Sequence, residues 1–433
     1  MDKSNSEPKI IIYEDKSVLY DENGHSNIFI EGKQTTQAKE RYKEIRNSLE
    51  HGFLEDIYTQ VDSNFKISQD KFELKYKNLI DQLIDAITSE AGRALIVLLF
   101  IQLTVKAISP DQNIRLHKGN GNSKTFSWNE GISMRSLDSN YVTPFLREKN
   151  LLKLNKFGAF MTRSLAENYP YSKLYKASIR GDKEDWIALV DAIESKDIDA
   201  LEALKYLISR LRNNSEAFIS IANTAHKLAL QVVKSKNFEE IENIIFTLVE
   251  TSNYKARIFE VAIHSLFEAL AENKYLTGSL ASMTQMRSAN KKHGNVGDIE
   301  VYDQKTLIES WDAKYGKEYL RDELEELEDK LEEHPDIEVA GFITDRSPQV
   351  DKEIETRKEE IEGLYNISIE ILSFKDWVNY KIEDIPSNDL ENIGKHWLID
   401  FVDDLGQKRR DVAPIDEPTE EWLKEIIEYL NNI

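Results

Sequence analysis

The sequence predicts a mixed fold: a largely α-helical N-terminal part, followed by a C-terminal α/β domain with a central mixed sheet. In residues 40–54, 72–108 and 182–276, apolar side chains recur at the spacing that is typical of amphipathic helices. From about residue 297, short apolar-alternating runs take turns with helical stretches. A strand–helix–strand order indicates a sheet whose strands are joined by crossover helices.

The first predicted region, residues 1–110, combines short strands with a helical bundle. Residues 8–32 alternate apolar and polar side chains and predict two or three strands. Helical spacing follows in residues 40–54 and 72–108. The most apolar run, residues 94–108, is shorter than the roughly 20 residues of a membrane span, so it predicts a buried core helix and no membrane partner.

The second predicted region, residues 111–253, is basic and mainly helical, and it is the candidate DNA-recognition region. Residues 111–183 contain 13 Lys+Arg against 6 Asp+Glu, a net charge of +7 in a chain whose total is −22. A basic island in an acidic protein indicates a surface for a polyanion, because a uniformly acidic protein repels nucleic acid. The alternative is that the aromatic and aliphatic residues here form core and the basic residues decorate the surface.

Six residues of this island are the candidate DNA contacts. Lys and Arg bind phosphates, while Arg and Asn also hydrogen-bond to base edges. The candidates chosen by residue type are Lys124, Arg135, Asn140, Arg163, Lys173 and Arg180.

The third predicted region, residues 254–433, has the mixed pattern. A helix at residues 255–272 precedes a hairpin at 297–316 that turns at residues 303–305. The pattern then predicts, in order, a helix at 317–334, a strand at 337–345, a helix at 349–365, a strand at 367–373 and a last helix at 420–430. The absence of cysteine excludes disulfides and thiolate metal sites, and it is consistent with a reducing cytoplasm.

The hairpin carries a possible metal site. Asp312 and Lys314 are two residues apart and therefore point to the same face of one strand. If the two strands pair, Asp298 lies close to Asp312, and these carboxylates with the backbone carbonyl of Ala313 make an oxygen-rich site suited to Mg²⁺. Lys314 could then orient an attacking water and stabilise developing charge. Glu309, at odd spacing from Asp312, should face away. The alternative is a solvated hairpin with an incidental salt bridge.

The spacing of Gly297-Asp298 and Asp312-Ala313-Lys314 resembles the PD-(D/E)xK nuclease superfamily, which includes many type II restriction endonucleases. The order of helices and strands over residues 254–378 fits the same family, so the resemblance implies a restriction-endonuclease-like α/β domain. Two departures leave the carboxylate chemistry intact. Val296-Gly297 replaces the proline before the first aspartate, and Asp312 fills a position that is more often Glu.

The resemblance also implies roles for particular residues. Asp298, Asp312 and the Ala313 carbonyl would hold the metal, and Lys314 would act in catalysis with the two aspartates. Many family members keep a glutamate on the preceding helix that helps to hold metal, and Glu260 matches it. The alternative for Glu260 is an ordinary acid on a helix surface.

The function that the resemblance implies is a Mg²⁺-dependent type II site-specific deoxyribonuclease that cuts double-stranded DNA, with Mn²⁺ as a possible substitute metal. A palindromic site favours a homodimer, because two-fold protein symmetry matches two-fold DNA symmetry. Protective methylation would come from a separate cognate methyltransferase, in the cytoplasm of a prokaryote. One alternative is a repair, recombination, transposition or phage-defence nuclease of the same fold. Another is a non-catalytic DNA-binding protein with a degenerate nuclease fold.

Overall fold

A computed structural model describes residues 7–20, 25–66, 73–87, 90–119, 126–154, 156–161, 163–179, 181–283, 295–408 and 418–433. The chain forms two compact units, Met1–Ala217 and Phe218–Ile433. This division does not coincide with the predicted boundaries at residues 110/111 and 253/254. One hydrophobic core runs from Ile45 to Leu211 across the first of these boundaries, and a second core joins residues on both sides of the other.

The first unit combines an antiparallel meander with a helical bundle. The meander has the strand order β1-β2-β3. Its elements are β1 (Lys9–Ile12), β2 (Lys16–Tyr20), β3 (Ser26–Ile30), α1 (Thr36–Glu50), α2 (Phe53–Gln60), α3 (Leu74–Asp85), α4 (Glu90–Ile108), α5 (Met134–Leu137), η1 (Asp138–Val142), α6 (Thr143–Glu148), η2 (Ala159–Met161), η3 (Arg163–Ala166) and α7 (Lys183–Glu194). The long helix α8 (Ala200–Val232) begins in this unit and continues into the second.

Helix α4 is the core helix that the sequence predicts. Leu98 and Phe100 are completely buried in it. The polar Gln102 is also buried, and its side chain donates to the carbonyl of Ile114 and accepts from Nε1 of Trp186, so burial leaves its amide satisfied. Among the helices in the described part of the chain, none is both long and apolar enough to cross a membrane.

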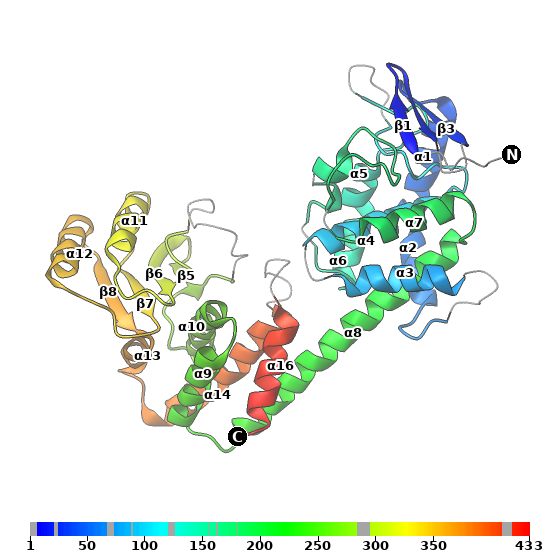
Figure 1. The fold of residues 1–433 in the computed structure, drawn as a ribbon. Helices are drawn as coiled ribbons and strands as arrows, with labels where there is room; N and C mark the ends of the chain where they lie inside the picture. Colours follow the sequence, from blue (N-terminus) through cyan, green and yellow to red (C-terminus); the bar gives the residue numbers. More distant parts are fainter. Residues whose placement is uncertain are drawn as a thin grey trace. The chain divides into compact units, whose positions relative to one another are not determined.

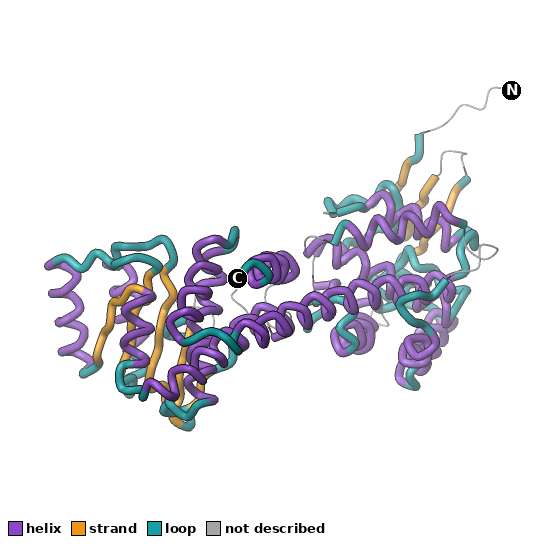
Figure 2. The backbone as a smooth tube through the Cα atoms, turned by 90° about the horizontal axis from the view of Figure 1, so that it is seen from below, coloured by secondary structure: helices purple, strands orange, loops and turns teal. Residues whose placement is uncertain are grey.

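The second unit contains a mixed five-stranded sheet of order β4-β5-β6-β7-β8. Strands β5 to β8 are labelled in Figure 1, and strands are drawn in orange in Figure 2. Its elements are α9 (Phe238–Thr251), α10 (Lys255–Glu272), β4 (Ser279–Leu280), β5 (Ile299–Asp303), β6 (Thr306–Lys314), α11 (Arg321–Leu331), β7 (Val339–Thr344), α12 (Lys352–Tyr365), β8 (Ser368–Ser373), α13 (Phe374–Ile382), α14 (Ser387–Asp403), η5 (Asp404–Lys408) and α16 (Thr419–Leu430). Strands β4, β5 and β6 pair antiparallel, whereas β6, β7 and β8 pair parallel through the crossover helices α11 and α12. The predicted mixed α/β architecture with a mixed sheet is therefore confirmed.

Helices cover both faces of this sheet. On one face, Phe342 and Ile369 pack with apolar residues of α11 and α12. On the other face, Trp311 and Ile343 pack with α10, α13 and α14. Because side chains of a strand alternate between faces, the fully buried Trp311 places its neighbours Ser310 and Asp312 on the α11 side.

Candidate active site at the end of the β5–β6 hairpin

The register of the hairpin brings Asp298 and Asp312 together. Ile299 pairs with Trp311 and Glu300 with Ser310, so the same register places Asp298 opposite Asp312. The Ala313 N–H donates to Oδ2 of Asp298 at 3.1 Å, which fixes this carboxylate at the end of β6. The predicted pairing of the two strands and their turn after Asp303 are both present.

Lys314 lies beside Asp312, as alternation along β6 requires. Nζ of Lys314 is 2.7 Å from Oδ2 of Asp312, and the two side chains are 18% and 13% exposed. Burial alone would lower the pKa of Lys314, but the charges of Asp312, Asp298 and Glu323 outweigh it, so the pKa lies above its ordinary value. The lysine is therefore a cation held against the carboxylates. Both side chains of the pair are thus partly shielded from solvent.

Glu260 is the third carboxylate of the site. It lies on α10, and it is only 4% exposed, which rules out an ordinary acid on a helix surface. Its negative charge contributes to raising the pKa of Asp298, so the two groups are close enough to interact across the sheet edge. Nη1 of Arg257, one helical turn earlier, lies 3.8 Å from Oε2 of Glu260.

The electrostatics of Asp298 show how the carboxylates share the site. Burial raises its pKa well above the ordinary value, and Asp312 and then Glu260 raise it further, against the Ala313 N–H that lowers it. Like charges that are buried together disfavour ionisation of each member. A hard divalent cation bound between these carboxylates would relieve their repulsion.

Glu309 faces the opposite side of the sheet, as its spacing from Asp312 predicts. It accepts a hydrogen bond from Nε1 of Trp311 and forms an ion pair with Lys381 of α13. Burial lowers the pKa of Lys381 despite this carboxylate. Glu309 therefore belongs to the packing between β6 and α13 and lies away from the carboxylate site.

Two residues near the site, Glu323 and Ser310, are not part of the motif on which the family resemblance rests. Glu323 of α11 is 8% exposed and forms an ion pair with Lys317. Its negative charge also contributes to raising the pKa of Lys314. Ser310 precedes Asp312 on the same face of β6, and its buried Oγ has no hydrogen-bond partner among the described residues. Strand alternation alone identifies Ser310 as a neighbour of Asp312, but only the packing of α11 on the sheet identifies Glu323.

The structure describes the side chains of three of the six candidate DNA contacts. Arg135 of α5, Asn140 of η1 and Lys173 are exposed, and Nη2 of Arg135 donates to the carbonyl of Phe160 at 2.7 Å. The backbone of Arg163 opens η3, but its side chain is not among the described parts. The remaining candidates, which lie outside the described residues, are Lys124 and Arg180.

The aromatic residues of the basic island are partly core. Trp128 and Tyr171 are completely buried. Tyr171 stacks on His117, with ring centroids 5.2 Å apart, and its hydroxyl donates to the carbonyl of Leu165. These two rings are therefore inaccessible to a ligand, as the core alternative for this region predicts.

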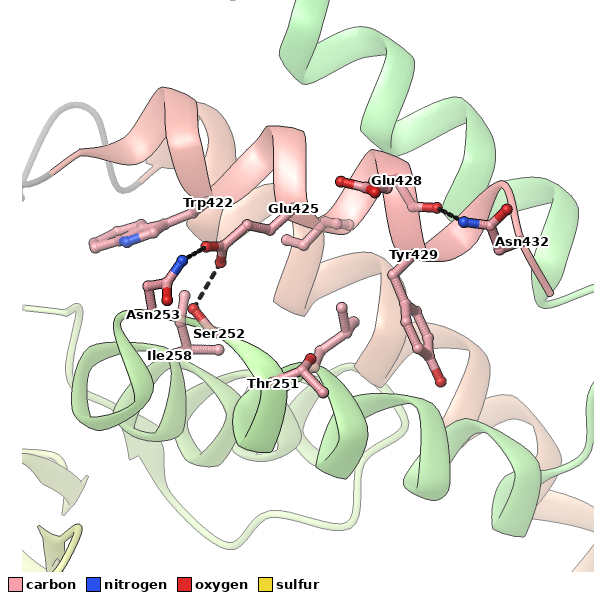
Figure 3. Close-up of a pocket in the computed structure, with 11 residues that line it drawn as sticks. Thr251, Ser252, Asn253, Ile258, Trp422, Glu425, Glu428, Tyr429 and Asn432 are labelled. Atoms are coloured by element: carbon pink, nitrogen blue, oxygen red, sulfur yellow. Dashed lines mark hydrogen bonds between the residues drawn. The ribbon is translucent and has the colours of Figure 1, made fainter.

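A separate pocket of about 360 Å³ opens between α9 and α16 (Figure 3). One of its two carboxylates, Glu425, accepts hydrogen bonds from Ser252 at 2.7 Å and from Asn253 at 3.1 Å. None of the sequence-predicted site residues lines this pocket. The predicted catalytic residues Asp298, Asp312 and Lys314 thus lie at the end of the hairpin and not in this pocket.

No model of a known protein family matches this chain, and no curated protein matches it. Asp298 and Asp312, which pair at the end of the hairpin beside Lys314, offer carboxylate oxygens of the kind that bind a divalent cation.

Proposed function

We propose that this protein is a Mg²⁺-dependent endonuclease that hydrolyses phosphodiester bonds of double-stranded DNA at a specific sequence, like a type II restriction enzyme. The observation that carries the proposal is the pairing of Asp298 with Asp312 at the end of the hairpin, beside Lys314, with the buried Glu260 acting on the charge of Asp298. The residues occupy the positions of the PD-(D/E)xK pattern on a mixed sheet with helices on both faces.

The donor set fits Mg²⁺, which prefers oxygen ligands and carboxylates. Asp298, Asp312, Glu260 and the carbonyl of Ala313 would hold the ion. When bound, Mg²⁺ supplies positive charge that stabilises the negative charge developing on the phosphate. The raised pKa of Asp298 supports this assignment, because a divalent cation relieves the repulsion between the carboxylates.

Lys314 has the geometry of a positioning and charge-stabilising group. Asp312 holds its ammonium at 2.7 Å, at the end of the same strand. From there the ammonium orients the water whose oxygen attacks phosphorus in line with the departing oxygen, and it stabilises the transition state as the P–O bond breaks. Mn²⁺ should replace Mg²⁺ because it accepts the same oxygen ligands.

The proposed substrate follows from the basic island of residues 111–183, which is positive within an otherwise acidic chain. The exposed Arg135, Asn140 and Lys173 offer one donor set for phosphates and base edges. A palindromic site would be bound by a homodimer, and a separate methyltransferase would protect the host site.

The test is digestion of a defined supercoiled plasmid with Mg²⁺, followed by sequencing of the ends. The wild-type protein should produce a fixed set of ends with Mg²⁺ and none with EDTA. The variants Asp312→Ala and Lys314→Ala should not cut but should still bind the DNA in a mobility-shift assay.

Matched controls lie on the same hairpin. Asp303 and Lys305 are exposed at its turn, at the other end of the strands from the site. Asp303→Ala and Lys305→Ala should therefore cut like the wild type. Undiminished cutting by Asp312→Ala or Lys314→Ala would reject the active site, whereas cutting at random positions would retain the nuclease and reject sequence specificity.

A further inference from the structure

A second cluster of metal-ligating side chains lies in the same unit, away from the hairpin. It comprises His264 and Glu268 of α10 together with Asp404, the first residue of η5. One potential ligand atom of each residue lies within 4.8 Å of the other two. His264 and Glu268 are four residues apart and therefore share one face of α10. Packing of α10 against η5 adds Asp404 to that face.

The histidine points an unsatisfied nitrogen into this cluster. His264 is 3% exposed, and its Nε2 lies 3.1 Å from the carbonyl of Ala281, which makes Nε2 the protonated nitrogen. Its Nδ1 has no hydrogen-bond partner among the described residues. The atoms that Nδ1 faces are Oδ2 of Asp404 at 3.4 Å and Oε1 of Glu268 at 3.8 Å. A backbone acceptor on the far nitrogen is the usual support of a metal-binding histidine.

The spacing of these atoms suits a small transition-metal ion. With metal–ligand bonds of about 2.0–2.1 Å, two ligands of a tetrahedral site are roughly 3.3–3.4 Å apart. The distance from Nδ1 of His264 to Oδ2 of Asp404 has this value already, and the distance to Glu268 exceeds it by a few tenths of an ångström.

Lys408 leaves the space between His264, Glu268 and Asp404 open, because its ammonium binds the carboxylate oxygens that face away from His264. Its Nζ lies 2.7 Å from Oε2 of Glu268 and 3.1 Å from Oδ1 of Asp404. The oxygens that face His264 are the other two. Each carboxylate can thus be held by Lys408 on one side and coordinate an ion on the other.

The local charge also favours a cation. Asp404 is completely buried, and Asp400, one turn earlier, is only 7% exposed. Burial, and after it the neighbouring carboxylates, raise the pKa of Asp400 to about 8 despite the nearby Lys408. A cation bound beside these buried carboxylates would relieve their mutual repulsion.

We propose that His264, Glu268 and Asp404 form a second metal site, specific for Zn²⁺ or a similar transition-metal ion, that cross-links α10 to η5. Imidazole together with carboxylates selects such ions over Mg²⁺. His264 lies one helical turn after Glu260, so the ion would also anchor the helix that carries the third carboxylate of the hairpin site. The proposal is independent of nuclease activity.

The alternative to a metal is a proton. Burial lowers the pKa of His264, but the attraction of the nearby Asp404 carboxylate outweighs it and raises the pKa above its ordinary value. A protonated His264 would then form an internal ion pair with the carboxylates of Asp404 and Glu268 in place of a metal ion. The two arrangements differ in whether the protein binds a metal ion with histidine as a ligand.

The experiment uses full-length protein carrying Asp298→Asn and Asp312→Asn, so that metal binding at the hairpin is suppressed. Zn²⁺ binding is measured by calorimetry, and Co²⁺ is used as an optical probe of coordination. We expect one Zn²⁺ per chain, a tetrahedral Co²⁺ spectrum, and a higher unfolding temperature with Zn²⁺ than with EDTA.

In this background, Glu268→Gln should weaken Zn²⁺ binding at least about tenfold, as should His264→Ala. Glu272→Gln, the next carboxylate on α10, is the matched control and should bind like the background. Glu268 is part-exposed, so Glu268→Gln tests the site even if the buried His264→Ala fails to fold. Absence of Zn²⁺ binding in the background, or equal affinity in Glu268→Gln, would overturn the proposal and leave the proton arrangement.

Discussion

Replacing Asp298 by asparagine should stabilise the metal-free protein while abolishing its response to Mg²⁺. The asparagine keeps an oxygen that can accept the N–H of Ala313, so the anchor at the end of β6 is retained. What is lost is one negative charge from a buried group that Asp312 and Glu260 repel. The variant therefore separates the charge of this side chain from its hydrogen bond.

The magnitude follows from the charges in the site. Two carboxylates about 4 Å apart repel by about 4 kcal/mol at an effective dielectric constant of 20. Lys314, 2.7 Å from Asp312, offsets part of this repulsion. Because the asparagine removes this repulsion, we expect Asp298→Asn to raise the free energy of unfolding by about 1–3 kcal/mol at pH 8 in EDTA.

The gain must also depend on pH with a defined sign. The folded-state pKa of Asp298 is raised, so the folded protein holds a proton that the unfolded chain releases above about pH 4. The wild type therefore loses stability as pH rises from that value through the raised pKa. Because the asparagine of the variant cannot ionise, the advantage of the variant is absent near pH 4 and grows as pH rises.

The assay is urea unfolding in EDTA at pH 5 and pH 8, followed by tryptophan fluorescence. Four of the six tryptophans belong to the second unit, so the signal reports mainly on the unit that contains the site. Addition of Mg²⁺ should stabilise the wild type and leave Asp298→Asn unchanged. A variant that is less stable than the wild type in EDTA at pH 8, or equally stabilised by Mg²⁺, would refute this account of the carboxylates.

Three further predictions concern the catalytic lysine, the basic island and the packing beneath the site. Lys314→Met should reduce the single-turnover cleavage rate by about 10²–10⁴-fold with little change in DNA affinity, and a rate within threefold of the wild type would contradict a role in positioning water. Lys173→Ala should weaken DNA binding and reduce the slope of log affinity against log salt by about 1, whereas an unchanged slope would exclude a phosphate contact. Glu309→Gln should lower the free energy of unfolding by about 3–5 kcal/mol, because it leaves the ammonium of Lys381 buried without its partner, and should spare metal-dependent cleavage at a temperature where it remains folded. Restoration of stability by adding Lys381→Met would support the ion pair as the cause, and loss of cleavage by the folded variant would place Glu309 in the site after all.

The local features of the hairpin could be predicted from the sequence alone. Alternation along residues 297–316 predicts two strands, and it places Asp312 and Lys314 on one face with Glu309 on the other. These inferences hold because side-chain direction in a strand depends only on position along it. The mixed architecture was predictable for a similar reason, since parallel strands need a crossover and the intervening helices are visible in the pattern.

The environment of each charged residue was decided by the tertiary structure. From the sequence alone, Glu260 could equally be an acid on the helix surface. Only the packing of α10 on the sheet shows that Glu260 is buried and that its charge raises the pKa of Asp298. Likewise, the tertiary structure of the first unit, which includes the basic island, buries the aromatic side chains of Trp128 and Tyr171. The extent of each unit also depends on contacts between distant segments, which local periodicity does not record.

The cluster of His264, Glu268 and Asp404 shows most clearly which features the sequence reveals and which depend on tertiary packing. The spacing of His264 and Glu268 on one helical face is visible in the sequence, but Asp404 comes from a segment far along the chain. Their meeting depends on how α10 packs against η5. The sequence by itself therefore determined which side chains share a strand or helix face, because those periodicities are local. The tertiary structure decided which of them are buried, which carboxylates repel one another and which can bind one ion, because burial and electrostatic coupling are set by groups distant in the chain.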